Sequence, residues 1–430
     1  MVDLPTYTWE HRRYWSETRY IKEHRQRQFR HSTLGHRVAG SVARHPRFRN
    51  YLRLSELPWL NEHVVENKVV FPGAGYISMA IEAAIRTDEV ESVKNIHVKD
   101  IVVKNALLIP STDEGVEVLL ELKPVTLSAK SHSDTWYEFN VFSYDENSNC
   151  TSHCHGLISV EKGDAAPLEY TAAYPEGTSF NELRQKTFRS MPAGTFYKNM
   201  ADLGLAYGEK FRLLKGSIES GVGFAVSDLV FDPTALPNDP GDETVMHPTL
   251  LDSFFHVIFH AVENRLGRPL DEPYVPSFFR ALKISGSFFD WKNDMDVKHF
   301  QVGSFTKLPS PRVAINDMIM QNEKGELMME IAGLEVTSLG REAPEGQGPR
   351  TLFYRQRWQP NFDMMTSVKG KPLSEIVDIF AHQFPDTKIL HVTSDLERTK
   401  EVIKSLATEK TERRRFKQLD VWSLQGKDFG

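Results

Sequence analysis

Two predicted helices are apolar on almost every side, and they constrain the fold more than any other feature of the sequence. The first follows Pro72 and reads Gly-Ala-Gly-Tyr-Ile-Ser-Met-Ala-Ile-Glu-Ala-Ala-Ile over residues 73–85, and the second covers residues 247–262. A helix that is hydrophobic all round must be buried on all sides. An antiparallel sheet wrapped around each helix is the simplest way to bury it. The sequence therefore predicts an α+β fold of two similar sheet-wrapped units side by side.

Strand-like runs accompany both helices in a similar order. Apolar or alternating runs of this length, separated by turn residues, predict strands. Around the first helix they cover residues 100–109, 116–122, 136–142 and 155–160, and around the second they cover residues 216–220, 223–230, 281–285, 298–304, 313–320 and 327–331. Residues 161–167 and 342–349 break the pattern with glycine, proline and charged residues, so we expect linkers there.

The composition narrows the class of protein. The chain has 430 residues, 40% hydrophobic and 26% charged, which is typical of a soluble globular protein of two or three domains. Its net charge of −6 argues against nucleic acid as the main partner, because a phosphate backbone requires a basic face. The sequence contains neither a membrane-spanning apolar run nor the apolar core of a signal peptide. We therefore expect a cytoplasmic protein that binds neither nucleic acid nor membrane.

A histidine and an aspartate stand near the starts of the two apolar helices. His63 precedes the first helix by one strand length, and Asp252 lies in the first turns of the second. His256 follows Asp252 by one helical turn on the same face. An imidazole and a carboxyl between two apolar units can act as general base and general acid. By pattern alone, a core histidine and a helix-capping aspartate remain alternatives.

The start of the first helix offers a site for negative charge. Pro72 suits the first helical position, where its missing N–H is no loss. The unpaired amides of Gly73 and Ala74 can polarise an oxygen that becomes negative during a reaction.

The run Cys150-Thr-Ser-His-Cys-His155 resembles a zinc motif, but its spacing on a strand argues against one. Successive strand side chains point to opposite faces, so the two cysteines should face away from the two histidines. We therefore expect no metal site. Two cysteines are also too few for a disulfide framework.

Several ordered motifs together resemble the dehydratase domain of polyketide synthases, most closely the highly reducing, iterative fungal type. The resemblance covers residues 4 to about 340. The motifs are His63 with Pro72 nine positions later, Phe71-Pro-Gly-Ala-Gly-Tyr76, Tyr207-Gly-Glu-Lys-Phe211, and His247-Pro-Thr-Leu-Leu-Asp252 followed by His256. Residues 4–15 look like the linker that follows the acyltransferase of such synthases.

The resemblance implies a domain order and a double hot-dog fold, in which each half is a sheet around a central helix. It implies a post-acyltransferase linker over residues 1–32 and hot-dogs over residues 33–165 and 166–341. After a linker at residues 342–350, residues 351–430 look like a truncated or degenerate methyltransferase segment. Where that family has its glycine-rich cofactor turn, this chain reads Thr393-Ser-Asp-Leu-Glu-Arg398. Without glycines the backbone cannot approach the cofactor closely, so we expect no binding of S-adenosylmethionine.

The resemblance also implies an activity, namely loss of water from a 3-hydroxyacyl chain to give the trans-2-enoyl thioester. The chain would be carried on the phosphopantetheine of an acyl carrier protein, and the dehydratase itself would bind no cofactor. His63 would be the base and Asp252 the acid. Partners would be the carrier protein, the other synthase domains and a second copy in a homodimer.

Three further residues match the family's pattern. Tyr207 would assist at the hydroxyl, although it could equally be a wall residue. His256 would orient the carboxyl of Asp252. Arg280 falls where relatives place a basic residue near the phosphopantetheine phosphate, with a solvated surface arginine as the alternative.

Asn67 departs from the family, which has glycine four residues after the histidine. Asparagine tolerates left-handed backbone angles better than other non-glycine residues, so we expect the turn to survive. Two alternatives stay open: a catalytically silent double hot-dog used for docking or dimerisation, and a product-template cyclase that shares the fold and the histidine–aspartate pair.

Overall fold

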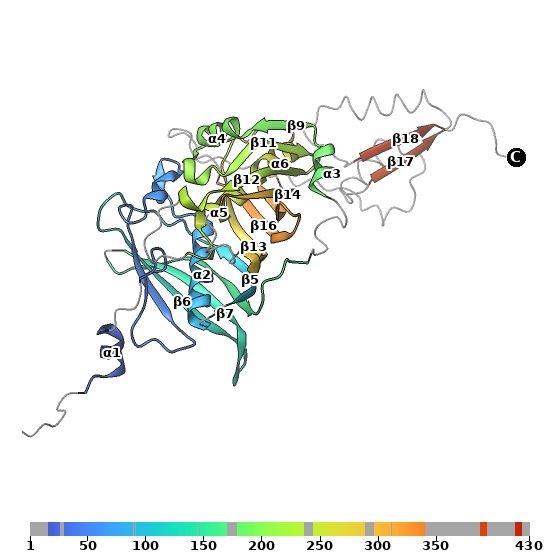
Figure 1. Ribbon diagram of the computed structural model, residues 1–430. Coiled ribbons are helices and arrows are strands. Elements are labelled where there is room, and N and C mark those ends of the chain that lie inside the picture. Colours follow the sequence, from blue (N-terminus) through green and yellow to red (C-terminus); the bar gives the residue numbers. More distant parts are fainter. Residues whose placement is uncertain are drawn as a thin grey trace, which may run out of the picture. The chain divides into compact units, whose positions relative to one another are not determined.

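The computed structural model describes most of the chain up to residue 339 and two short strands beyond it. The described residues are 16–25, 30–88, 90, 92–145, 147–169, 179–235, 244–288, 296–310, 312–339, 388–393 and 418–423. The chain divides into two compact units, residues 1–342 and 343–430 (Figure 1).

One 13-stranded antiparallel sheet runs through the described part of the first unit. Its strand order is β1-β2-β6-β7-β8-β5-β13-β16-β15-β14-β12-β11-β9. The first six strands in this order are β1 (His36–Arg37), β2 (Arg47–Leu52), β6 (Val116–Ser128), β7 (Ser131–Tyr144), β8 (Cys150–Lys162) and β5 (Val93–Val103). The other seven are β13 (Tyr274–Ser285), β16 (Leu327–Ser338), β15 (Val313–Asn322), β14 (Lys298–Ser310), β12 (Phe224–Phe231), β11 (Leu214–Gly221) and β9 (Arg189–Pro192).

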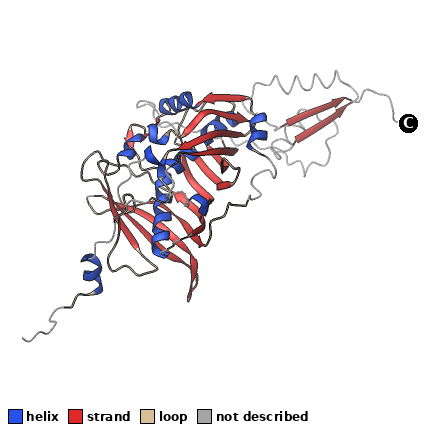
Figure 2. Cartoon of the chain, viewed as in Figure 1, coloured by secondary structure: helices blue, strands red, loops and turns tan. Residues whose placement is uncertain are grey.

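The two halves of this sheet repeat the same topology. In the first half the order β6-β7-β8-β5 follows the helix α2 (Gly73–Asp88), and in the second the order β14-β15-β16-β13 follows α5 (Pro248–Phe255) and α6 (Val257–Leu266). The halves meet where β5 pairs antiparallel with β13. The predicted duplication and the double hot-dog fold are therefore confirmed, because each half wraps a sheet around its own central helix (Figures 1 and 2).

The helix α2 is buried as its all-round apolar sequence requires. Every residue from Ala74 to Ala84 is buried, including Ser78 and Glu82. The helix packs against β6, β7 and β8 and also contacts α5, while α6 packs against β11, β12 and β14. Period-two alternation is equally clear in β7, where Tyr137, Phe139 and Val141 face the core. Among the described residues, no helix is long and apolar enough to cross a membrane.

The second central helix is not continuous, which corrects the single helix predicted over residues 247–262. His247 caps α5, and the chain passes into α6 at His256. There His256 N–H donates to the carbonyl of Ser253 at 3.3 Å, and Phe259 N–H donates to the carbonyl of His256 at 3.2 Å. These hydrogen bonds join residues three apart, as in a 3-10 helix, and tighten the turn where the side chains of Asp252 and His256 bond each other.

The strand predicted over residues 100–109 was misplaced. The observed β5 begins at Val93 and ends at Val103. Beyond it Lys104 N–H donates to the carbonyl of His153 in β8 at 2.8 Å, and Ile109 N–H donates to the carbonyl of Val69, before α2, at 3.0 Å. The error arose because polar residues at alternate positions of residues 93–99 lower the apolar content, although Ile96 and Val98 face the core.

Shorter elements complete the first unit and frame its interior. A small sheet has the order β10-β3-β4. Its strands are β10 (Leu205–Tyr207), β3 (His63–Val65) and β4 (Lys68–Val69). The remaining helices are α1 (Arg19–Arg25), α3 (Phe180–Gln185) and α4 (Ala193–Asp202), with short 3-10 turns at Pro58–Glu62, Glu209–Phe211, Pro233–Ala235 and Gly286–Phe288.

In the second unit the described residues form one pair of parallel strands, β17 (Lys388–Thr393) and β18 (Gln418–Ser423). Parallel neighbours require a crossover connection, as in α/β folds. The segment that replaces the glycine-rich turn lies outside the described residues apart from Thr393, so the expectation about S-adenosylmethionine stays a prediction.

Candidate active site

His63 begins the strand β3, and its backbone and side chain hold it in one orientation. Residue Tyr207 of β10 pairs with it across the small sheet. The ring Nδ1 lies 2.7 Å from the carbonyl oxygen of Val70. Because a carbonyl can only accept, Nδ1 must carry the proton, and in the neutral ring Nε2 keeps a free lone pair. The His63 residue is 7% exposed, so this lone pair faces the interior.

The turn after His63 has the backbone expected for a glycine motif, although it contains none. Residues Glu66 and Asn67 have φ of 47° and 64°, and Val65 pairs with Lys68 on either side of them. Two consecutive left-handed residues make the type I′ turn that suits a two-residue hairpin. The expectation that Asn67 preserves the turn is therefore confirmed.

The start of α2 lies just beyond this hairpin. The helix begins at Gly73, so the predicted first helical position of Pro72 is wrong by one residue. Pro72 is the cap, because its carbonyl accepts the N–H of Gly75 at 2.8 Å. A β-carbon built on Gly73 would meet no atom within 4 Å. The amides of Gly73 and Ala74 are at the positive end of the helix, where intrahelical acceptors are lacking.

Gly75 is a glycine for reasons of packing. A β-carbon there would lie 2.4 Å from the ring of Phe71. This ring is buried, so the helix end and the strand before it fit closely together.

Asp252 approaches His63 from the other half of the fold. Its Oδ2 lies 3.8 Å from His63 Nε2, and both side chains are 9% exposed. The same oxygen lies 3.1 Å from His256 Nε2. The structure thus brings the three predicted residues together, with the basic nitrogen of His63 facing the carboxyl across a gap longer than a hydrogen bond.

His256 is held in its neutral form beside this carboxyl. Burial lowers the pKa of His256 by more than its hydrogen bond to the carboxylate of Asp252 raises it. Its Nδ1 lies 3.4 Å from the hydroxyl of Tyr197 in α4. A neutral imidazole can donate to a carboxylate or, in its other tautomer, accept from a carboxylic acid. It can therefore hold Asp252 in place in either protonation state.

Tyr207 lines the same space. Its ring centroid is 4.0 Å from that of His256 and 5.7 Å from that of His63. Burial raises the pKa of Tyr207 well above its ordinary value, and the charge of Asp252 adds to the shift. The hydroxyl therefore remains a hydrogen-bond donor at neutral pH.

Arg280 does not join this group. It lies on the outer face of β13 with a side chain 64% exposed, and its nearest carboxylate is Asp317 at 4.0 Å. The neighbouring Phe279 points inward, where its ring centroid is 5.4 Å from that of Phe255 in α5. Phe279 thus packs against the second central helix, whereas Arg280, the next residue in β13, faces solvent.

Sequence reasoning missed two partners of the site. Tyr197 contacts His256 from α4, and Phe211 lies against His63 with ring centroids 5.2 Å apart. The apolar spacing of Phe196, Tyr197 and Met200 was a signal for a half-buried helix. Nothing in that spacing indicated which tyrosine would reach the histidine.

The Cys150–His155 run forms no metal centre. Among the described residues, no group of three or more histidine, cysteine, aspartate or glutamate side chains is placed to hold a metal. The predicted strict alternation is wrong here, because a register shift between β7 and β8 leaves His153 as an extra residue and both it and Cys154 are buried. His153 instead donates from Nδ1 to the carbonyl of Asn105 at 3.0 Å and accepts from Ser143 Oγ at 2.7 Å.

Two family models match the chain. A model described as "Polyketide synthase dehydratase domain" matches residues 31–144, and one described as "Polyketide synthase dehydratase N-terminal domain" matches residues 175–346. Together they cover most of both sheet-wrapped halves.

The curated relatives are fungal synthases much longer than this chain. The hybrid PKS-NRPS synthetase pynA of Aspergillus niger is 47% identical over 420 residues, which are 96% of this chain and 11% of the synthetase. The highly reducing polyketide synthase tstA of Talaromyces stipitatus is 31% identical over 402 residues, 89% of this chain and 15% of the synthase. The chain thus spans only a small part of the length of the relatives it matches.

Solved structures with a similar fold include dehydratase domains. The domain from the CurF module of the curacin polyketide synthase has a TM-score of 0.57 and 21% identity, and the match covers 72% of this chain and 99% of that domain. A domain of PpsC from Mycobacterium tuberculosis has a TM-score of 0.53 and 16% identity, covering 72% and 99%. At these identities the similarity shows the fold.

Proposed function

The chain belongs to the family of polyketide synthase dehydratase domains, and from this premise we propose that it converts a 3-hydroxyacyl thioester into the trans-2-enoyl thioester. The substrate would be carried on the phosphopantetheine of an acyl carrier protein. The observation that carries the proposal is the buried gap of 3.8 Å between His63 Nε2 and Asp252 Oδ2, with one residue from each half of the fold.

His63 has the geometry of the base. Its Nδ1–H is engaged by the Val70 carbonyl, which leaves Nε2 to take the proton from the carbon next to the thioester. The same hydrogen bond stabilises the imidazolium that forms, since Nδ1 keeps its acceptor.

The start of α2 would bind the thioester oxygen. Removing the proton places negative charge on that oxygen, and backbone amides at a helix N-terminus stabilise such charge without having to reorganise. Gly73 leaves room beside these amides for the substrate. Pro72 has no N–H and so would contribute shape only.

Asp252 would protonate the departing 3-hydroxyl. His256 orients the carboxyl at 3.1 Å, and the Tyr207 hydroxyl can donate to the same leaving oxygen. Water then leaves with the proton of Asp252, and the proton gained by His63 returns to the carboxylate across the gap. The C–O bond breaks as the electron pair of the C–H bond forms the double bond, and the protein groups only transfer protons, so the cycle requires no oxidant or reductant and no cofactor beyond the carrier arm of the substrate.

Arg280 would bind the phosphate of that arm from outside the buried site. Its exposed guanidinium is available to an anion, although Asp317 at 4.0 Å offsets part of its charge. The carrier protein, the other domains of a synthase and a second copy in a homodimer are the partners that we propose on the strength of the family.

The silent docking module remains the alternative, and Asn67 was the feature that favoured it. The left-handed turn at Glu66 and Asn67 weakens that interpretation, because His63 keeps its hydrogen bond to Val70. A domain used only for docking would have no need of this arrangement.

The test follows enoyl formation by ultraviolet absorbance and mass from a 3-hydroxyacyl pantetheine thioester. We expect turnover by the wild type and its loss in His63→Ala and in Asp252→Asn. Tyr137→Phe is the matched control, since it removes a hydrogen bond of 2.7 Å to Asp88 at the far end of α2. Absence of turnover by a folded wild type, even with a carrier-bound substrate, would favour the docking module.

A further inference from the structure

One buried acidic residue has no part in the proposed reaction. Glu82 lies in the middle of α2 and is 0% exposed. Glutamate is almost never fully buried unless it is paired, because removing it from water is costly. The contacts of its carboxyl therefore indicate why the chain has it there.

The carboxyl of Glu82 holds the backbone that leads into α5. Its Oε1 accepts the N–H of Val245, and one turn earlier in α2 the hydroxyl of Ser78 donates to the carbonyl of Met246. Val245 and Met246 immediately precede His247, the cap of α5. Two side chains of α2 thus form hydrogen bonds with the backbone segment that leads into α5.

These two hydrogen bonds connect the helices that carry the two halves of the proposed active site. The helix α2 begins beside the hairpin of His63, whereas α5 carries Asp252. The two helices are in contact, and Val245 and Met246 lead directly into the cap of α5. A shift of this segment would therefore move Asp252 relative to His63, whose Nε2 lies 3.8 Å from Asp252 Oδ2.

Residues 30–34 place the ring of His31 near the same carboxyl. His31 Nδ1 accepts the N–H of Leu34 at 3.2 Å, so in the neutral ring the proton is on Nε2. That Nε2 lies 3.7 Å from Glu82 Oε2. One helical turn after Glu82, Arg86 Nε lies 3.5 Å from the same oxygen.

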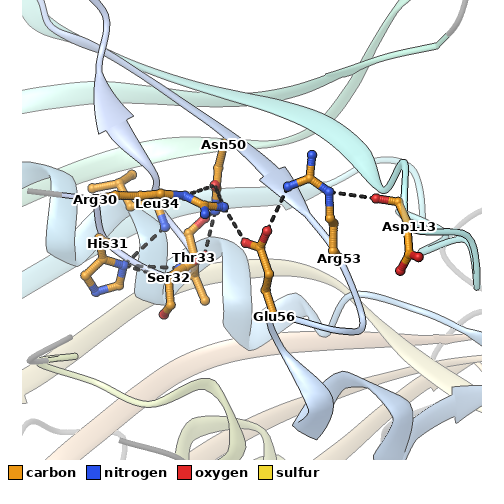
Figure 3. Close-up of polar contacts among 9 residues, drawn as sticks. All are labelled: Arg30, His31, Ser32, Thr33, Leu34, Asn50, Arg53, Glu56 and Asp113. Atoms are coloured by element: carbon orange, nitrogen blue, oxygen red, sulfur yellow. Dashed lines mark hydrogen bonds and ion pairs between the residues drawn. The ribbon is translucent and has the colours of Figure 1, made fainter. Parts of the chain in front are cut away.

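The segment that carries His31 is itself firmly attached, as Figure 3 shows. The buried Asn50 of β2 donates to the carbonyls of Ser32 and Thr33 at 2.6 and 2.9 Å. Its side-chain oxygen accepts from Arg30 at 2.9 Å, and Arg30 also bonds Glu56. Residues 30–34 are therefore attached to β2 where His31 lies near Glu82.

We propose that Glu82 is a positioning residue for the dehydration, which sets the distance between His63 and Asp252 by holding Val245, and that His31 braces it. The inference rests on the proposed function. Chemistry of this kind is sensitive to small displacements, since an error of about 1 Å can reduce the rate by about 10²-fold.

Three variants of the full chain test it, with Tyr137→Phe as the control. Glu82→Leu keeps the size of the side chain and removes the acceptor for Val245. Glu82→Gln keeps the acceptor oxygen for Val245 and changes only the atom that faces His31 and Arg86, so it serves as the conservative rescue of the bond to Val245. Ser78→Ala removes the hydrogen bond to the carbonyl of Met246 with minimal change in side-chain volume.

We expect Glu82→Leu to lower kcat by about 30- to 100-fold while KM changes by less than about threefold, because substrate still binds but the acid is displaced. Glu82→Gln should stay within about threefold of the wild type in kcat, and Ser78→Ala should fall between them. Normal kcat in a folded Glu82→Leu, or a Glu82→Gln as impaired as Glu82→Leu, would overturn the proposal. Should Glu82→Leu not fold, Ser78→Ala with an unchanged kcat would do so.

Crystal structures of the variants test the positioning role independently of the dehydratase activity. Structures of Glu82→Leu and Ser78→Ala should show the His63 Nε2 to Asp252 Oδ2 distance changed from 3.8 Å, and those of Glu82→Gln and Tyr137→Phe should not. An unchanged distance in both of the first two variants refutes the positioning role whether or not the wild type turns over. A changed distance with an inactive wild type supports the positioning role and refutes only the dehydratase.

Discussion

The turn at Asn67 allows the sharpest test of whether the departure from the family's glycine matters. Its φ of 64° lies in the left-handed region, where a residue with a β-carbon is disfavoured by roughly 1–2 kcal/mol and asparagine by less. Glycine removes that cost but loses about 0.5–1 kcal/mol in conformational entropy on folding. The two effects nearly cancel, so Asn67→Gly should change the free energy of unfolding by less than about 0.5 kcal/mol.

A β-branched residue at the same position should behave differently. Asn67→Val should lower the free energy of unfolding by about 1–2 kcal/mol, because valine is strongly disfavoured in the left-handed region. It should also lower kcat, because the hairpin that pairs Val65 with Lys68 carries the carbonyl of Val70 to His63.

The assay combines denaturant unfolding with enoyl formation for the wild type and both variants. We expect Asn67→Gly to remain within about threefold of the wild type in kcat. A tenfold or greater gain in kcat for Asn67→Gly would refute the reasoning, since it would mean that asparagine distorts the turn. An Asn67→Val variant as stable and active as the wild type would show that the turn does not position His63.

Further predictions concern Tyr207, His256 and the acid limit of stability. Tyr207→Phe should lower kcat by up to about 10²-fold with little change in KM, as measured by steady-state kinetics, because it removes a donor to the leaving oxygen. His256→Leu should lower kcat more than His256→Gln, which can still bond Asp252, and equal losses would contradict an orienting role. Burial lowers the pKa of His153, so the folded state favours its neutral ring. Its contribution to stability is therefore full above the unfolded pKa of about 6.5 and is lost as pH falls through the lower folded value. Denaturant unfolding between pH 5 and 8 should show a shallower acid decline for His153→Gln than for the wild type, and identical slopes would contradict this.

The sequence by itself determined the architecture, and three of the site residues predicted from it, His63, Asp252 and His256, lie together in the structure. Helices with no polar face and strands of period two leave few ways to bury the apolar surface, so burial alone led to two sheet-wrapped helices. The left-handed backbone of Asn67 was also predictable from the preference of asparagine, whereas the left-handed backbone of Glu66 was not.

Only the tertiary structure decided how those residues meet. The distance from His63 to Asp252, the hydrogen bond that sets the His63 tautomer and the contact of Tyr197 with His256 depend on how elements far apart in the sequence pack. Local patterns also failed where packing overrides alternation, as at the His153 bulge and at the start of β5. The hydrogen bond from Val245 N–H to Glu82 also depends on tertiary packing, because the backbone that a buried carboxyl bonds can come from a distant part of the sequence. The physical reason is that burial and backbone preference act on each residue in its own segment, whereas side-chain distances result from the packing of the whole core.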